Sequence, residues 1–136
     1  MSDASATAFT HEAMPFTVGL GLRIDRASAD EVVGTADHAP ERCTVGGALH
    51  GGYLMALADS VGALCAYNNL PEGAGTSTIE SKTNFFRAAT GGEVTITATP
   101  LHVGRTTIVV QTDVTRADGK RVTRTTQTQA VLPPPT

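Results

Sequence analysis

The stretch "LHGGYLMALADSVGALCAYNNL", residues 49–70, decides the fold. Apolar side chains recur in it every three or four residues, which is the spacing of one face of an α-helix. The positions on this face are Leu54, Leu57, Ala58, Val61, Leu64 and Cys65. The pattern predicts a helix from Gly51 to Tyr67, ended by the Pro and Gly residues of "NLPEGAGT". In its middle lies Asp59, a poor helix former whose charge is costly to bury.

The sequence on both sides of this helix has the alternation and the β-branched residues of strands. A candidate hairpin comes first, with strands over residues 15–25 and 31–38 joined by the polar turn "DRASAD". Further strands are expected at residues 77–86, 93–101, 105–116 and 121–132. One long helix and five to six mainly antiparallel strands predict an α+β fold in which the curved sheet wraps around the helix.

The length of 136 residues predicts a single domain. The first dozen residues are small and polar, and "LPPPT" closes the chain. We therefore expect one domain over residues 1–136, with a core over about residues 15–132 and a flexible tail at each end.

The composition, with 40% apolar and 17% charged residues, is that of an ordinary globular protein. A net charge of −3 argues against a nucleic-acid partner. No apolar run reaches the ~18 residues of a membrane span, and the N-terminus lacks the features of a signal peptide, so we expect a cytoplasmic protein without a membrane partner. Cys43 and Cys65 lack metal or redox spacing. We expect two free thiols, no metal and no cofactor.

Charge and threonine content suggest two kinds of partner. Residues 1–68 hold three basic and eight acidic side chains, whereas residues 69–136 hold seven and five. The basic half is either a solvated sheet surface or a site for a small polyanion. The strands are rich in threonine and leave free edges, which favours self-association.

Asp59 lies off the apolar face of the predicted helix. Its flank of the helix is made mostly of small residues: Gly52, Met55, Ala56, Gly62 and Ala63. No basic residue that could pair with it occurs between Arg42 and Lys82. A surface carboxylate solvated by water is one interpretation. We favour a functional carboxylate, because small neighbours leave space for a ligand.

Glycines gather at the start of the helix, at positions 46, 47, 51 and 52. The first N–H groups of a helix have no intrahelical acceptor, so this end can donate to a developing oxyanion. The spacing matches neither a phosphate loop nor a dinucleotide-binding turn.

Gly51 and Asp59 are separated by about 12 Å of helical rise and cannot easily reach one carbonyl. Two antiparallel copies of the helix across a twofold axis would bring them together.

The segments "HGGYLMALADSVG" and "TIESKTNFFRAATGGEVTITATPLHVGRTT" resemble the hotdog-fold acyl-CoA thioesterases of the phenylacetate-degradation and 4-hydroxybenzoyl-CoA type. The resemblance extends over about residues 15–132. It implies that Asp59 is the catalytic carboxylate, that the Gly51 N–H polarises the thioester carbonyl and that His50 shapes the turn. It also implies that Thr78, or the nearby Ser77, assists water or the carboxylate.

The resemblance further implies dimers or dimers of dimers, with CoA along the subunit interface. Arg87, Arg105 and Arg124 are the candidate contacts for its phosphates. Gly52 and Tyr53 are candidate substrate contacts, and Met55, Leu57 and Leu64 are either pocket or plain core. The acyl group itself stays open.

One departure concerns Thr44, where relatives usually carry Asn or Gln to position the substrate carbonyl or the water. A second is Ala88, where a proline is common.

The leading hypothesis is hydrolysis of an acyl-CoA thioester, with Asp59 as general base or nucleophile. The alternative is a non-catalytic acyl-CoA binding or sensing module, to which Thr44 lends weight. A dehydratase would need a His base, and His11, His38 and His102 show no such arrangement. No GxSxG elbow is present.

Overall fold

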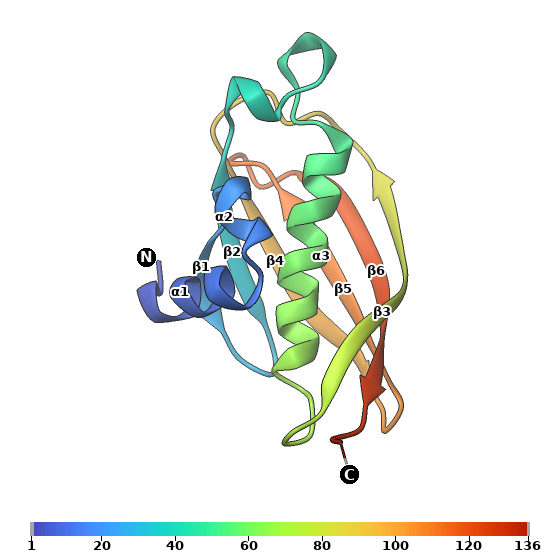
Figure 1. Ribbon diagram of the computed structural model, residues 1–136. Coiled ribbons are helices and arrows are strands. Elements are labelled where there is room, and N and C mark those ends of the chain that lie inside the picture. The colour runs from blue at the N-terminus through green and yellow to red at the C-terminus, as the bar shows by residue number, and fades with distance from the viewer. Residues whose placement is uncertain (1, 136) are drawn as a thin grey trace.

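The computed structural model describes residues 2–135 and has one long helix packed on a six-stranded antiparallel sheet (Figure 1). The strands are β1 (Arg23–Ala27), β2 (Val32–Asp37), β3 (Gly75–Phe85), β4 (Glu93–Val103), β5 (Thr107–Thr115) and β6 (Arg121–Leu132). Their order in the sheet is β1-β2-β4-β5-β6-β3. Helix α3 (Gly51–Tyr67) crosses the concave face, so the predicted hotdog fold is confirmed.

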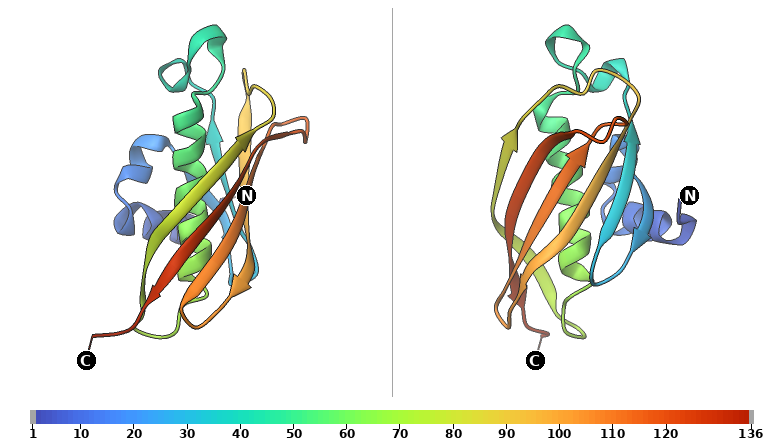
Figure 2. Two further views of the ribbon diagram at one scale, coloured as in Figure 1. Left: turned by 90° about the vertical axis from the view of Figure 1, so that its right-hand side faces the viewer. Right: turned by 180° about the vertical axis from the view of Figure 1, so that it is seen from behind.

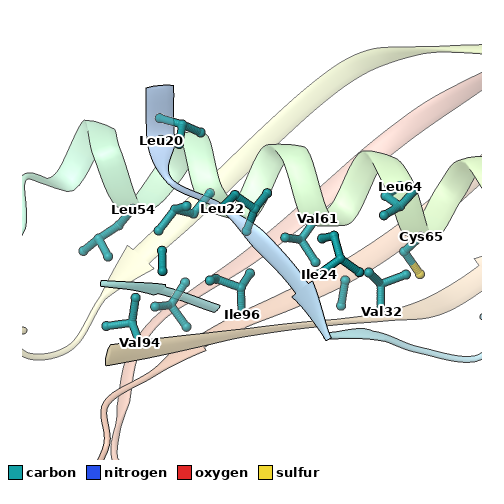
Figure 3. Packing of buried hydrophobic residues seen from close by; sticks show 14 of the residues in the cluster. Leu20, Leu22, Ile24, Val32, Leu54, Val61, Leu64, Cys65, Val94 and Ile96 are labelled. Carbon is teal, nitrogen blue, oxygen red and sulfur yellow. The ribbon is translucent and has the colours of Figure 1, made fainter. Parts of the chain in front are cut away.

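The apolar face of α3 packs against apolar side chains from β1, β2, β4 and β5 (Figure 3). Leu54, Val61 and Leu64 lie over side chains from β1, β2 and β4, among them Ile24 and Ile96. Leu57 and Val61 are fully buried. Each such side chain contributes about 1.5–3 kcal/mol relative to exposure. This contact fixes which flank of the helix is left for Asp59.

Toward β6 the concave face becomes polar. On β6 the inward positions are Thr123, Thr125, Gln127 and Gln129, and all four are buried. Thr112 on β5 is buried beside them. Threonine suits a strand, but buried glutamines need partners. The partners of these glutamines lie on α3 and β3, and they locate the candidate site.

The N-terminal residues form two helices that the sequence analysis did not predict. Residues expected to be a tail form α1 (Ala4–Ala13), capped by Asp3, whose carboxylate accepts a hydrogen bond from the Ala6 N–H at 2.9 Å. Residues expected to begin the first strand form α2 (Phe16–Leu20), and β1 follows it. Figure 2 shows both helices beside β1 and β2. At the other end, residues 133–135 have no regular structure.

The two edges of the sheet differ. The edge of β1 is covered by α1, because the Thr7 hydroxyl accepts from the Ile24 N–H at 2.9 Å and His11 bonds the Leu22 carbonyl at 2.8 Å. The opposite edge is β3, an eleven-residue strand whose side chains are mostly exposed on both faces. The fold therefore leaves one long open edge.

None of the helices within residues 2–135 is long and apolar enough to cross a membrane.

Candidate active site

The start of α3 is a preformed donor site. The His50 Nδ1 atom accepts a hydrogen bond from the Gly52 N–H at 2.8 Å and so caps the helix. The Gly51 N–H occupies the first helical position, which has no intrahelical acceptor. A Cβ at Gly51 would lie 3.1 Å from the ring of Phe85, so glycine lets this turn lie against β3. The Gly51 N–H is thus a backbone donor without a partner in its own helix.

Asp59 lies in the middle of α3 with its side chain exposed. Its Oδ1 atom accepts a hydrogen bond from Gln127 Nε2 at 3.1 Å. Gln127 reaches it from β6 and is fully buried. Among the described residues Asp59 forms no ion pair. The carboxylate is therefore bonded to the sheet on its inner side through Gln127, and its outer side is exposed to solvent.

The hydroxyl candidates on β3 lie on the same side as Asp59. Thr78 Oγ1 accepts a hydrogen bond from Gln129 Nε2 at 2.8 Å, and Thr76 donates to the other end of the same amide at 3.1 Å. Ser77 adjoins them. A bulge follows Thr78, because the register with β6 shifts between Thr78 and Glu80. The structure thus connects Thr78 to a buried glutamine rather than directly to Asp59.

A cavity of ≈ 280 Å³ opens beside this group. Its walls come from α1, α3, β3 and β6, with Met14 following α1: Phe9, Ala13, Met14, Ala63, Leu64, Tyr67, Thr76, Ser77, Thr78 and Gln129. Ala63 is one helical turn after Asp59, so the cavity begins one turn of α3 beyond the carboxylate, on the same flank of the helix. Phe9 packs on Tyr67 with ring centroids 5.6 Å apart. The supposed N-terminal tail therefore supplies a wall of the cavity.

The remaining candidates on α3 have structural tasks. The Tyr53 hydroxyl donates to the Leu20 carbonyl at 2.6 Å, and Arg42 lies over its ring at 5.4 Å. Burial raises the pKa of Tyr53, and Arg42 acts in the opposite direction. Tyr53 thus fastens α2 to α3. The Gly52 N–H is occupied by His50, and Leu57 belongs to the core.

The three arginines do not form one cluster. Arg124 makes two hydrogen bonds of 2.8 Å to Asp113, which raise the pKa of Arg124. Arg87 is exposed and donates to the Arg121 carbonyl. Arg105 lies at the turn from β4 to β5, which Figure 1 shows at the opposite end of the sheet. Within one chain Arg105 therefore lies apart from Arg87 and Arg124, and their contact with CoA phosphates stays a prediction.

Thr44 lies in the loop before α3, between two short 3-10 helices at Pro40–Arg42 and Val45–Gly47. Its side chain is exposed, and its N–H donates to the Ala48 carbonyl at 2.8 Å. This loop lies beyond the N-terminal end of α3 (Figure 1). Within one chain Thr44 is therefore grouped with His50 and Gly51, and Asp59 is grouped with Thr78.

Sequence reasoning missed the two glutamines and the residues of α1. The alternation in "VTRTTQTQAV" places Gln127 and Gln129 on one face of β6, which was the available signal. That signal does not say that β6 lies behind Asp59, because this depends on the strand order. The cavity wall from α1 was missed with the helix itself.

Comparison with known proteins gives a consistent result. The family model of the Thioesterase superfamily matches residues 46–123. Protein Rv1847 of Mycobacterium tuberculosis is 32% identical over 95 residues, which cover 68% of each chain. The solved structure of thioesterase HI1161 of Haemophilus influenzae has a TM-score of 0.84 and 28% identity, over 91% of this chain and 87% of that one. AziG of S. sahachiroi has a TM-score of 0.83 and 30% identity, over 87% and 96%.

Proposed function

The chain belongs to the thioesterase superfamily, and we propose that it hydrolyses an acyl-CoA thioester to free CoA and a carboxylic acid. Membership of the family supports thioester hydrolysis in general. The observation that carries the proposal is an exposed carboxylate, Asp59, on a flank of small residues next to a mainly apolar cavity. A carboxylate with space in front of it can act on a thioester carbonyl and its attacking water.

As a general base, Asp59 takes a proton from water while the water oxygen bonds to the thioester carbonyl carbon. The carbonyl oxygen becomes an oxyanion facing a helix N-terminus. The C–S bond then breaks, and the CoA thiolate receives the proton from Asp59. As a nucleophile, Asp59 would bond to the carbonyl carbon, expel the thiolate and form an anhydride that water hydrolyses. Both routes return the free carboxylate.

The oxyanion donor in this proposal is the Gly51 N–H of a second copy of the chain. The open edge of β3 supports such an assembly, because the β1 edge is covered by α1. Three large apolar side chains near the open edge are exposed: Met55, Ile79 and Phe85. A twofold pairing through β3 would cover them and place the start of one α3 beside the middle of the other. Each dimer would hold two equivalent sites.

The cavity favours acyl groups of moderate size. Its volume of ≈ 280 Å³ is at the lower end of small-molecule sites, roughly 300–1,000 Å³. From Ala63 to Tyr67 the helix rises about 6 Å. We therefore propose a medium aliphatic chain or a single aryl ring as the acyl group. For the CoA phosphates, Arg87 is the better candidate, because Arg124 is already paired.

Release of free thiol from a series of CoA thioesters tests this function. The series contains acetyl, hexanoyl, octanoyl, benzoyl, phenylacetyl and palmitoyl thioesters. We expect the highest kcat/KM among the hexanoyl to phenylacetyl substrates and a low value for palmitoyl-CoA. Tight binding of acyl-CoA without thiol release would instead establish the binding module that Thr44 suggested.

The first prediction concerns Asp59 itself. Asp59→Asn keeps the size and the Gln127 contact but cannot accept a proton, so kcat for the best substrate should fall by at least ~100-fold. Circular dichroism and gel filtration should match the parent. Near-parental turnover by this folded variant would remove Asp59 from the reaction.

A further inference from the structure

We propose that Gln127 is a positioning residue, whose buried amide holds the carboxylate of Asp59 in the orientation used for hydrolysis. The inference rests on the proposed function of Asp59. It starts from one contact, in which Gln127 Nε2 donates to Asp59 Oδ1 at 3.1 Å. The donor comes from β6 and the acceptor from α3, so the bond joins the sheet to the helix at the candidate site.

The surroundings of Gln127 are unfavourable for its own side chain. It is fully buried, and its Oε1 atom has no hydrogen-bond partner within residues 2–135. The nearby Thr112 hydroxyl is also buried and unpartnered in that range. Unpaired buried polar atoms are destabilising, and an apolar side chain would avoid the cost. A glutamine used only for packing would have no reason to be here.

The orientation of the amide follows from the charge of its partner. An ionised carboxylate has only acceptors, so the NH₂ end of Gln127 must face Asp59 and the Oε1 end must point away. Rotating the amide by half a turn would place two acceptors against each other. The unpartnered oxygen is thus the direct consequence of the bond to Asp59.

The helix carries a glycine where this amide lies. A Cβ at Gly62 would be 2.0 Å from Gln127 Oε1 and 2.9 Å from its Cδ, so the Gln127 amide would have to move away from its present position. Glycine in the middle of a helix is unfavourable relative to alanine. Gly62 therefore gives up helix stability and clears the space that Gln127 needs to reach Asp59.

The bond to Asp59, the unpartnered Oε1 atom and the glycine at position 62 all keep the Gln127 amide directed at the carboxylate. A short carboxylate on an exposed helix flank can rotate freely about its last bond. With Oδ1 bonded to Gln127, that rotation is restricted, and the second oxygen is left without a bond to Gln127. Holding a reacting group in its productive orientation accelerates a reaction by removing the entropy of alignment. Gln127 would act through Asp59 without touching the substrate.

Kinetics of Gln127→Met test the inference. Methionine has a similar length and no hydrogen-bond donor, so it should fill the same space. Loss of a hydrogen bond to a charged group predicts a kcat lower by about 10- to 100-fold, with KM within about twofold of the parent. Thr123→Val is the matched control, because it removes a different buried polar group, a hydroxyl, from the same face of β6 and should leave both constants unchanged.

Two outcomes would overturn the inference while the proposed function stands. One is a parental kcat in folded Gln127→Met although Asp59→Asn is inactive. The other is a raised KM with a parental kcat, which would make Gln127 part of substrate binding. The failure of the proposed function looks different, because the parent protein would then release thiol from no thioester.

A measurement that needs no activity completes the test. Urea unfolding of the parent, Asp59→Ala, Gln127→Met and the double variant, at one protein concentration, forms a double-mutant cycle. We expect the two substitutions to be coupled by about three- to tenfold in the unfolding equilibrium constant. Additive effects would show that Gln127 does not hold Asp59, whatever the enzyme hydrolyses.

Discussion

Arg87 and Arg124 lie near the same end of the sheet but differ in what neutralises them. Arg124 is paired with Asp113 through two hydrogen bonds of 2.8 Å. Arg87 has no carboxylate partner among residues 2–135, and its guanidinium contacts only a backbone carbonyl. An unpaired exposed cation is available to a phosphate, whereas a paired one must first give up its partner.

The second prediction compares these two arginines. Arg87→Ala should raise KM for the best CoA thioester by about two- to fivefold, the effect of one exposed charge, and leave a pantetheine thioester unaffected. Arg124→Ala and Arg105→Ala are the controls and should leave KM for both substrates near the parental value. Equal effects of Arg87→Ala on both substrates would show that it does not contact the phosphates.

The third prediction uses the acid on the outer face of the sheet. Burial acts to raise the pKa of Asp113, but hydrogen bonds and charges from Arg124 and Arg121 outweigh it and lower the pKa. A carboxylate with a lowered folded-state pKa adds stability above its unfolded value, near 3.9, and loses it as the pH falls through the folded value. Asp113→Asn should therefore lower Tm at pH 7, and the difference from the parent should shrink steadily between about pH 5 and pH 2. A pH-independent difference would contradict this assignment.

At the scale of elements, α3 can pack closely on β6 because Gly62 has no Cβ where the Gln127 side chain lies. The fourth prediction is that Gly62→Ala lowers stability in the parent, although alanine is the better helix former, because its Cβ collides with Gln127. In a Gln127→Ala background the same substitution should be neutral or stabilising by up to about 1 kcal/mol. Urea unfolding of the four proteins measures this. If Gly62→Ala lowers the free energy of unfolding in both backgrounds, the contact with Gln127 is not the cause of the loss.

The elements that the sequence predicted well are those with strong local patterns. Helix α3 has its predicted bounds because its apolar positions repeat over seventeen residues, and β3 to β6 end within two residues of expectation. Helix α1 was missed because only Phe9 is large and apolar, and the helix buries Thr10 instead of a hydrophobic stripe. The sequence predicts a strand in place of helix α2 because "FTVGL" has β-branched residues, whereas the contact of α2 with Tyr53 is not local.

The same distinction applies to the candidate site. Three of its residues are close in sequence, and each carries a local signal. His50 precedes the helix as a cap, Gly51 is a glycine at its start, and Asp59 is a carboxylate without a basic partner nearby in sequence. Gln127 follows Asp59 by sixty-eight residues. Its place depends on β6 lying between β5 and β3, and no pattern within β6 specifies that order. The structure was needed to bring it under the carboxylate.

At the scale of the whole molecule, the candidate site is divided. Each chain holds Gly51 and Thr44 at one end of α3 and Asp59 with Thr78 along its flank, about 12 Å of helix away. The covered β1 edge and the open β3 edge leave one route for pairing two copies by strand addition. Activity would then depend on assembly.

The fifth prediction tests this division by mixing two inactive proteins. Asp59→Asn and Gly51→Pro should each be inactive alone. The backbone suits proline at the first helical position, because His50 before it is already extended. The proline Cβ would lie 3.1 Å from the Phe85 ring, so circular dichroism must show that Gly51→Pro is folded. After subunit exchange, half of the dimers are mixed and each has one intact site, so activity should return to about a quarter of the parental value. Mass spectrometry must confirm the mixed dimers. Confirmed mixed dimers without activity would exclude a site shared between chains.

The position of β3 in the sheet also sets the order of events during synthesis. Its only neighbour in the described sheet is β6, the last strand to be made, while β4 and β5 between them in sequence pair elsewhere. On the ribosome, β3 has no partner strand until β6 has been made, beginning with Thr123 opposite Phe85. Such a strand is prone to wrong pairing, and charged and polar residues such as Glu80 and Lys82 counter that tendency. If two copies pair through β3, as proposed above, the edge that they share is complete only after β6 has been translated.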